Sequence, residues 1–234
     1  MPELPKRADV VVAGGGVGGA IIAARLATET QKSVVLLEAG PDYGPRTSGA
    51  WPESLLDFSA MPVDSHSWGY LSASKYGTRS LPLDRARVIG GCSSHNGCAA
   101  VWGHRADYDG WAALGNPGWD AGSLLPCFER AMRQLRVFQP TRAQITPWHR
   151  ACLDSAPGAG IPVIPTLNDF DADFGIAIIE INVADGVRWN TSFAYLDPVR
   201  DRPNLTIIGN ALVDRALIDQ GRAIGVAAVI DGQS

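Results

Sequence analysis

The chain has 234 residues, of which 46% are hydrophobic and 19% are charged, and its formal net charge at pH 7 is −4. This apolar content excludes an intrinsically disordered protein, and the length suffices for one large globular domain. The negative balance leaves no excess of basic side chains to neutralise a phosphate backbone, so we expect no nucleic-acid partner.

Neither the cysteines nor the N-terminal segment indicates an extracellular or membrane protein. Near the N-terminus, Lys6 and Arg7 precede an apolar run, but glycines fill that run and Arg25 closes it. The four cysteines show no CxxC pair and no metal-ligand spacing: Cys92, Cys98, Cys127 and Cys152. We therefore expect a cytoplasmic protein with reduced thiols, no metal site, no signal peptide and no membrane span.

The first predicted elements are a strand, a helix and a second strand. Residues 8–13 (ADVVVA) form a short β-branched run that stops at glycine, as a buried parallel strand does. Small and apolar residues over 20–27 predict a helix that packs tightly on a sheet, and residues 33–38 (SVVLLE) predict the next parallel strand. Together these segments predict a βαβ unit.

The loop between the first strand and the helix has the spacing G-x-G-x-x-G of dinucleotide-binding loops. Gly14 permits the tight turn, Gly16 lets the backbone approach a pyrophosphate, and Gly19 allows close packing of the helix. Val17 and Gly18 lie at the predicted helix N-terminus, whose N–H groups bind phosphates. Without a ligand, the same pattern would be only a glycine-rich strand-to-helix turn.

Glu38 ends the second predicted strand about 20 residues after the loop, where a carboxylate binds ribose hydroxyls. Its charge also disfavours a 2′-phosphate through like-charge repulsion, which argues against NADP. The loop alone does not separate NAD from FAD. The continuation does, because Glu38-Ala39-Gly40 followed by an irregular stretch is more typical of FAD proteins.

The middle of the chain is less regular. Residues 40–85 are rich in Pro, Gly and Ser and contain Phe58, Trp68 and Tyr70 without periodicity, which predicts a long excursion over a ligand. Further along, residues 121–135 predict a helix with a proline near its start, and residues 176–183 predict a strand that begins a second sheet.

The last segment predicts successive strands with turns between them. Residues 204–209, 211–218 and 223–230 form apolar runs, and the turns fall at 219–221 and at 231–232. Because the turn at 231–232 has no return strand, we expect an artificial, processed or split boundary at the end of the chain.

A second glycine cluster identifies a resemblance. Residues 85–97 read RARVIGGCSSHNG, and residues 103–111 read GHRADYDGW. Both closely resemble the first signature of the glucose-methanol-choline (GMC) oxidoreductases, in which glycines and small hydroxyl residues let the main chain run beside the flavin. EAGP at 38–41 and RPNL at 202–205 extend the resemblance over essentially the whole chain.

This resemblance implies an α/β fold, namely a Rossmann-like FAD-binding domain with the beginning of a substrate-domain sheet. It implies the first part of the FAD-binding domain over 1–160, the start of the substrate-binding sheet over 161–190 and a return to the FAD-binding domain over 191–234. The candidate cofactor-binding residues are Gly14, Gly16, Val17, Gly18, Gly19, Glu38, Ala39, Trp68, Arg87, Gly90, Gly91, Ser94, His95, Asn96, Gly97, Cys98, Ala99 and Val213.

The string GCSSHN at 91–96 is most similar to choline oxidase-like members, in which this histidine carries FAD covalently through the 8α-methyl carbon. His95 is therefore the candidate attachment site, and a packed histidine beside an unattached flavin is the alternative. The same resemblance places Asn96 near the reactive edge of the flavin, Arg87 and Ser94 near the phosphates, and Val213 near the adenine.

The chain departs from choline oxidase-like members at two positions. The cage tryptophan of those proteins falls at or near Phe58, a weaker cation binder, and Gly97 replaces a serine beside the flavin. Both changes argue against choline without excluding another alcohol.

The function implied is FAD-dependent oxidation of an alcohol by hydride transfer from its carbon to flavin N5. This chemistry needs a base at the substrate hydroxyl, which family members supply from a histidine paired with histidine or asparagine near the C-terminus. We expect no catalytic residue within the 234 residues, and we expect a second chain or a further segment to supply it. A non-catalytic flavin-binding module and a non-redox lyase on the same scaffold remain open.

Overall fold

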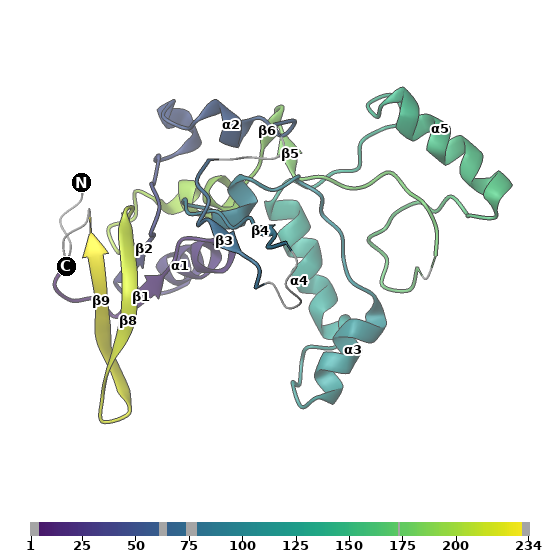
Figure 1. Ribbon diagram of the computed structural model, residues 1–234. Coiled ribbons are helices and arrows are strands. Elements are labelled where there is room, and N and C mark those ends of the chain that lie inside the picture. Colours follow the sequence, from purple (N-terminus) through teal and green to yellow (C-terminus); the bar gives the residue numbers. More distant parts are fainter. Residues whose placement is uncertain (1–4, 61–64, 74–78, 173, 231–234) are drawn as a thin grey trace. The chain divides into compact units, whose positions relative to one another are not determined.

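The computed structural model describes residues 5–60, 65–73, 79–172 and 174–230 (Figure 1). The chain divides into two compact units. One contains the described parts of 1–97 and 186–234, and the other contains those of 98–185. The first unit therefore joins two segments that are far apart in the sequence.

A three-stranded parallel sheet lies at the centre of the first unit. β1 (Val10–Ala13) pairs with β2 (Val34–Leu37), and β2 pairs on its other side with β7 (Leu205–Ile208). α1 (Val17–Glu29) connects β1 to β2 and lies against both strands (Figure 1). The predicted βαβ unit is confirmed.

Small side chains allow α1 to pack closely on this sheet. The buried residues of the helix are all alanines: Ala20, Ala23, Ala24 and Ala27. All four residues of β2 are buried as well, as expected for the central strand of a parallel sheet.

An antiparallel hairpin completes the first unit. β8 (Ala211–Asp219) pairs with β9 (Arg222–Ile230), and the turn between them has positive φ at Gln220 and Gly221. The hairpin packs onto the sheet through a cluster made of Val35, Leu37, Ile208 and Ala211. The predicted strands at 204–209, 211–218 and 223–230 are thus confirmed, and the predicted turn at 231–232 lies outside the described residues.

The other elements of the first unit are short. β3 (Tyr70–Leu71) pairs with β4 (Pro82–Leu83) in antiparallel orientation. The remaining ones are η1 (Arg46–Ser48), α2 (Glu53–Leu56), η2 (Gly91–Ser94), β6 (Val187–Arg188), the π-helical turn η4 (Ser192–Leu196) and η5 (Asp197–Val199). The described part of residues 40–85 is otherwise irregular, as predicted.

The second unit is mainly helical. It contains α3 (Arg105–Ala113), α4 (Ala121–Gln134), α5 (Pro147–Ser155), η3 (Ala156–Ala159) and the short strand β5 (Val183–Ala184). α3 and α4 share a core around Tyr108, Ala121 and Phe170. The predicted helix over 121–135 is confirmed, and it begins where the Asp120 carboxylate accepts a hydrogen bond from Ser123 N at 2.9 Å.

The strand predicted over 176–183 is wrong as a continuous element. Ile176 forms one isolated bridge with Val163, and Ile181 forms separate bridges with Ala99 and Phe138. The segment changes partner along its length, since Ile181 N donates to Phe138 O whereas the next N–H donates to Cys98 O. A strand needs one continuous neighbour, so only the two residues of β5 form regular pairing.

The compact units do not follow the boundaries expected at 160 and 190. Residues 98–160 fall in the second unit, and the first unit resumes at Gly186. The functional division of the chain stays a prediction. No helix in the described ranges combines the length and apolar character needed to cross a bilayer.

Candidate functional site

The first glycine loop leaves the N-terminus of α1 open. Gly14 has φ +93, and its N–H donates to Leu37 O at 2.7 Å, which fixes the turn to the end of β2. A Cβ at Gly19 would lie 1.9 Å from Gly14 O, whereas no atom lies within 4 Å of a Cβ at Gly18. Val17 and Gly18 are exposed. The start of α1 is therefore accessible, and the first N–H groups of a helix, which have no partner within the helix, are what an anion site uses.

Glu38 connects this loop to the end of β2. Its side chain is buried, with Oε2 accepting from Gly15 N at 2.7 Å and Oε1 accepting from Gly40 N at 2.8 Å. Burial raises the pKa of this carboxyl, and the two backbone hydrogen bonds and the charge of Arg87 oppose that rise. A carboxylate oxygen has a second lone pair, so these bonds leave Glu38 able to accept from ribose hydroxyls.

The two glycine clusters lie directly against each other. Gly90 N donates to Gly15 O at 2.7 Å, and a Cβ at Gly91 would lie 2.7 Å from the Cα of Gly16. Gly40 is equally constrained, because a Cβ there would lie 2.0 Å from Arg87 O. Main chain thus approaches main chain at both points, which only glycine allows. The sequence pattern predicted the glycines but not this contact between the clusters.

Small hydroxyl side chains hold the second cluster in shape. Ser94 is fully buried and its Oγ donates to Ile89 O at 2.8 Å, while Ser93 Oγ donates to Gly90 O at 2.6 Å. Ser93 Oγ also accepts from Thr191 N at 3.0 Å. Ser94 therefore stabilises its own loop, and its contact with the phosphates stays a prediction.

His95 follows this loop and is 8% exposed. Burial lowers its pKa, the charges of Arg188 and Arg85 act in the same direction, and Asp84 opposes them. These causes favour the neutral imidazole, which has a lone pair on one ring nitrogen. Asn96 is half-buried beside it, and Gly97 is exposed.

A second group of expected residues gathers around Arg87. Its Nε donates to Ala39 O at 3.0 Å, and its guanidinium lies over the Trp68 ring at 5.3 Å from the centroid. Trp68 in turn stacks on Tyr70 with an interplanar angle of 8°. The structure thus brings Ala39, Trp68 and Arg87 together next to Glu38.

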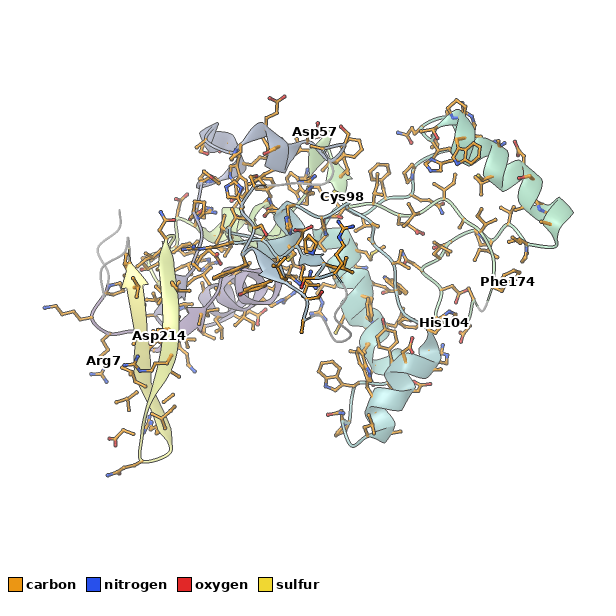
Figure 2. The ribbon with its side chains drawn as sticks, in the orientation of Figure 1. Arg7, Asp57, Cys98, His104, Phe174 and Asp214 are labelled. Atoms are coloured by element: carbon orange, nitrogen blue, oxygen red, sulfur yellow. The ribbon has the colours of Figure 1, made fainter. Side chains whose placement is uncertain are left out.

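Three expected residues are not members of these groups. Cys98, labelled in Figure 2, is buried and has φ +60. Cys98 and Ala99 belong to the second unit, where Ala99 bridges Ile181. Val213 is half-buried in β8 and packs on the cluster formed by sheet and hairpin. The proximity of these three residues to FAD stays a prediction.

The other histidines form local contacts. The hydroxyl of Tyr43 lies 2.7 Å from Nε2 of His66, His104 lies at the N-cap of α3, and His149 is exposed on α5. Phe58 is 42% exposed. Among the described residues, no three His, Cys, Asp or Glu side chains are arranged to hold a metal ion.

Sequence reasoning missed a run of buried polar residues at the end of β6 and just after it, namely Arg188, Asn190, Thr191 and Ser192. Arg188 and Thr191 bond to the second glycine cluster, whereas Asn190 accepts from Phe193 N and Ser192 accepts from Arg200. The only sequence signal was a run of polar residues next to the apolar segment 193–196, which does not indicate a buried position.

The geometry of the first unit defines a dinucleotide-binding βαβ site with a second glycine loop over it. Comparisons with known proteins name the class. The family model described as GMC oxidoreductase matches residues 8–234. This chain belongs to that family.

Two curated relatives are choline dehydrogenases. The mitochondrial choline dehydrogenase of Mus musculus is 35% identical and the oxygen-dependent choline dehydrogenase of Rhizobium etli is 32% identical. The alignments cover 95% and 94% of this chain but only 40% and 42% of those relatives. The chain therefore spans about two fifths of their length.

Solved structures agree on the fold. Pyridoxine 4-oxidase from Mesorbium loti matches with a TM-score of 0.84 at 25% identity, over 97% of this chain and 47% of that one. A formate oxidase matches with a TM-score of 0.79 at 22% identity, over 97% of this chain and 43% of that one. The predicted Rossmann-like FAD-binding fold is confirmed.

The residues of the first unit fit FAD, the cofactor of this family. The loop of Gly14 and the open N-terminus of α1 suit a pyrophosphate, and Glu38 keeps acceptor capacity for a ribose. The neutral ring of His95 suits a flavin partner.

Proposed function

We propose that this chain is the FAD-holding portion of an oxidoreductase that oxidises an alcohol. The observation that supports it most is the direct packing of the Gly90-Gly91 segment on the Gly15-Gly16 segment. In each of these two glycine clusters some positions have no room for a Cβ, namely Gly15 and Gly19 in the first and Gly90 and Gly91 in the second, and the helix N-terminus at Gly18 stays open beside them. The bound FAD would accept a hydride from the alcohol carbon at flavin N5.

The substrate class is a small primary alcohol. This proposal is supported by the names of the relatives, which include choline dehydrogenases and a pyridoxine oxidase. Phe58 in place of a cage tryptophan argues against a quaternary ammonium as the preferred head group.

We further propose that His95 binds FAD covalently. His95 would form an N–C bond to the 8α-methyl carbon of the flavin. In forming this bond, that carbon and the imidazole would each lose one proton, and the two electrons would go to the flavin ring, from which an acceptor such as dioxygen would remove them. The lowered pKa of His95 supports this proposal, because only the neutral imidazole is a nucleophile.

The base for the substrate hydroxyl is proposed to come from outside these 234 residues, either from a further segment or from a second chain. His66 is engaged with the Tyr43 hydroxyl, and the two histidines at the N-terminal ends of α3 and α5 are exposed. A cytoplasmic location also stays a prediction.

One experiment tests whether the protein holds a flavin and whether an alcohol reduces it. Full-length protein is purified, its absorption spectrum is recorded, and it is mixed anaerobically with choline, pyridoxine and simple primary alcohols. Bleaching of the flavin band by at least one alcohol is expected, and a flavoprotein that no alcohol reduces would argue for a non-redox role on the same fold.

Acid precipitation of the same sample tests the covalent bond. A yellow pellet is expected from the wild type and a colourless pellet from His95→Gln. Free FAD in the supernatant of the wild type would refute attachment at His95 without affecting the redox proposal.

A further inference from the structure

Arg188 is a buried cation whose hydrogen-bond partners are main-chain carbonyls. Its side chain in β6 is 0% exposed. Nη1 donates to Ser94 O at 3.0 Å, and Nη2 donates to Asp57 O at 2.8 Å. Longer contacts of 3.2 to 3.4 Å reach the carbonyls of Ser54, Leu55 and Ala60. No carboxylate pairs with this guanidinium in the part of the chain that the structure describes.

These contacts join three segments of the first unit. They link β6, the main chain immediately before His95, and the segment 54–60, which comprises the last residues of α2 and the turn after them and is called the 54–60 turn below. An antiparallel bridge between Asp57 and Val187 fixes the same turn to β6 from another direction, and Figure 2 marks Asp57 on that turn. One side chain thus sets where the His95 loop lies relative to the 54–60 turn.

The chemistry of this contact requires arginine. A planar guanidinium donates from two separate terminal nitrogens, here to Ser94 O and to Asp57 O, whereas the three N–H groups of a lysine ammonium share one nitrogen and reach only carbonyls around that point. Stability alone gives a weak reason for a charge here, because even a buried ion pair is often replaceable by apolar residues without loss, and Arg188 has only carbonyl partners. The bond from Arg188 to Ser94 O, directly before His95, therefore suggests a role in the flavin site.

We propose that Arg188 is a positioning residue for the flavin-attachment site. It fixes the Ser94 carbonyl, and with it the His95 side chain, against the 54–60 turn, and it holds a permanent positive charge near the imidazole. This inference rests on the proposed function, since His95 is the residue proposed to carry FAD.

The charges around His95 are consistent with this role. Burial is the largest cause of the lowered pKa of His95, and the charge of Arg188 is the next. Arg85 and His66 act in the same direction and Asp84 acts against them. Arg188 is the fully buried member of this group, so solvent screens its charge least.

Three variants of the full-length protein separate position from charge. Arg188→Met removes both, and Arg188→Lys keeps the charge but cannot reach the Ser94 and Asp57 carbonyls together. Arg200→Lys is the matched control. The guanidinium of Arg200 is also largely buried, but, unlike that of Arg188, it bonds to the carboxylates of Asp42 and Asp197. The readouts are thermal unfolding, the fraction of FAD retained by the acid pellet at different incubation pH values, and an NMR titration of His95.

We expect Arg188→Met to shift the His95 titration upward and to retain less covalent FAD near neutral pH, with recovery as the pH rises. Arg188→Lys should retain less covalent FAD at every pH, with a smaller shift of the titration. Arg200→Lys should lose stability but keep the wild-type titration and covalent fraction.

Folded Arg188 variants with the wild-type titration of His95 and wild-type FAD retention would overturn the inference. If Arg188→Met does not fold, the comparison of Arg188→Lys with Arg200→Lys decides it. If the wild type holds FAD without a covalent bond, the covalent proposal fails. The role of Arg188 is then tested by comparing the His95 titration in the wild type and the Arg188 variants.

Discussion

The buried carboxylate of Glu38 has a structural role in the protein in addition to any role in binding a ligand. Its two oxygens accept from N–H groups at Gly15 and Gly40, so one side chain closes the first glycine loop on the strand end. Hydrogen bonds to a charged group are worth about 1.5 to 3 kcal/mol each in protein stability. The sequence predicted an acidic residue for the ribose, and the structure adds its role in the loop.

Replacing this carboxylate should therefore cost stability even without FAD. Glu38→Gln keeps one acceptor and places an NH2 group against one of the two backbone N–H donors. We expect a loss of about 1.5 to 3 kcal/mol in the free energy of unfolding, measured with urea. Glu29→Gln is the control on the exposed end of α1, and it should change stability by less than about 0.5 kcal/mol.

His95 makes the stability of the protein depend on pH. Its pKa in the folded state lies below the ordinary value of 6.5, so the unfolded chain binds a proton at a higher pH than the folded chain. Stability is then fully present above pH 6.5 and falls as the pH drops from there toward the lowered pKa of the folded state.

Urea unfolding at a series of pH values measures this effect. The wild type should lose stability as the pH falls below 6.5, and His95→Gln should flatten that decline. His66 has a pKa lowered by burial in the same direction, so His66→Gln separates the second contribution. A decline that His95→Gln leaves unchanged would show that the imidazole is not the group responsible.

At the scale of elements, the strand-to-helix junction depends on close approach of backbone atoms. Two neighbouring glycines of α1 differ in this respect, since a Cβ at Gly19 would meet Gly14 O at 1.9 Å and a Cβ at Gly18 would meet nothing within 4 Å. The sequence pattern treats both as members of one motif. Only the tertiary structure distinguishes the packing glycine, Gly19, from the open one, Gly18.

This pair offers a matched test. Gly19→Ala must displace the first glycine loop, so we expect a loss of at least about 2 kcal/mol in the free energy of unfolding and weaker FAD binding. Gly18→Ala should keep or raise stability by up to about 1 kcal/mol, because alanine is the better helix former. Equal effects of the two substitutions in urea unfolding would contradict the geometry of the loop.

Sequence patterns predicted regular elements well where one segment has one partner. β1, α1, β2, β7 and the β8–β9 hairpin follow their predicted ranges because burial on one continuous neighbour imposes a clear period. The strand predicted over 176–183 failed because Ile181 bonds to Phe138 while its neighbour bonds to Cys98. Apolar runs do not reveal such a change of partner.

At the scale of the molecule, the hairpin and the sheet share one core in the first unit. Leu37 and Val35 of β2 meet Ile208 and Ala211 there, and residues of β9 pack against them. This cluster attaches the hairpin to the sheet whose β2 ends at Glu38.

Truncation of this core should therefore destabilise the first unit. Leu37→Ala is expected to cost about 2 to 5 kcal/mol in the free energy of unfolding, through lost burial and the cavity it leaves. Ile224→Ala on β9 is the control, because that side chain is 66% exposed and its loss should cost less than about 0.5 kcal/mol. Similar losses of stability for both variants in urea unfolding would contradict the assignment of Leu37 to the core.

The sequence by itself determined the βαβ unit, the dinucleotide loop and the likeness to GMC oxidoreductases, because these depend on local spacing of glycines and on short periodic runs. Only the tertiary structure decided which residues meet across the chain. The contact of Gly91 with Gly16, the bonds of Glu38 to Gly15 and the carbonyls around Arg188 all join segments far apart in sequence. Local periodicity carries no information about such pairs, since backbone approach and burial are set by how the elements pack.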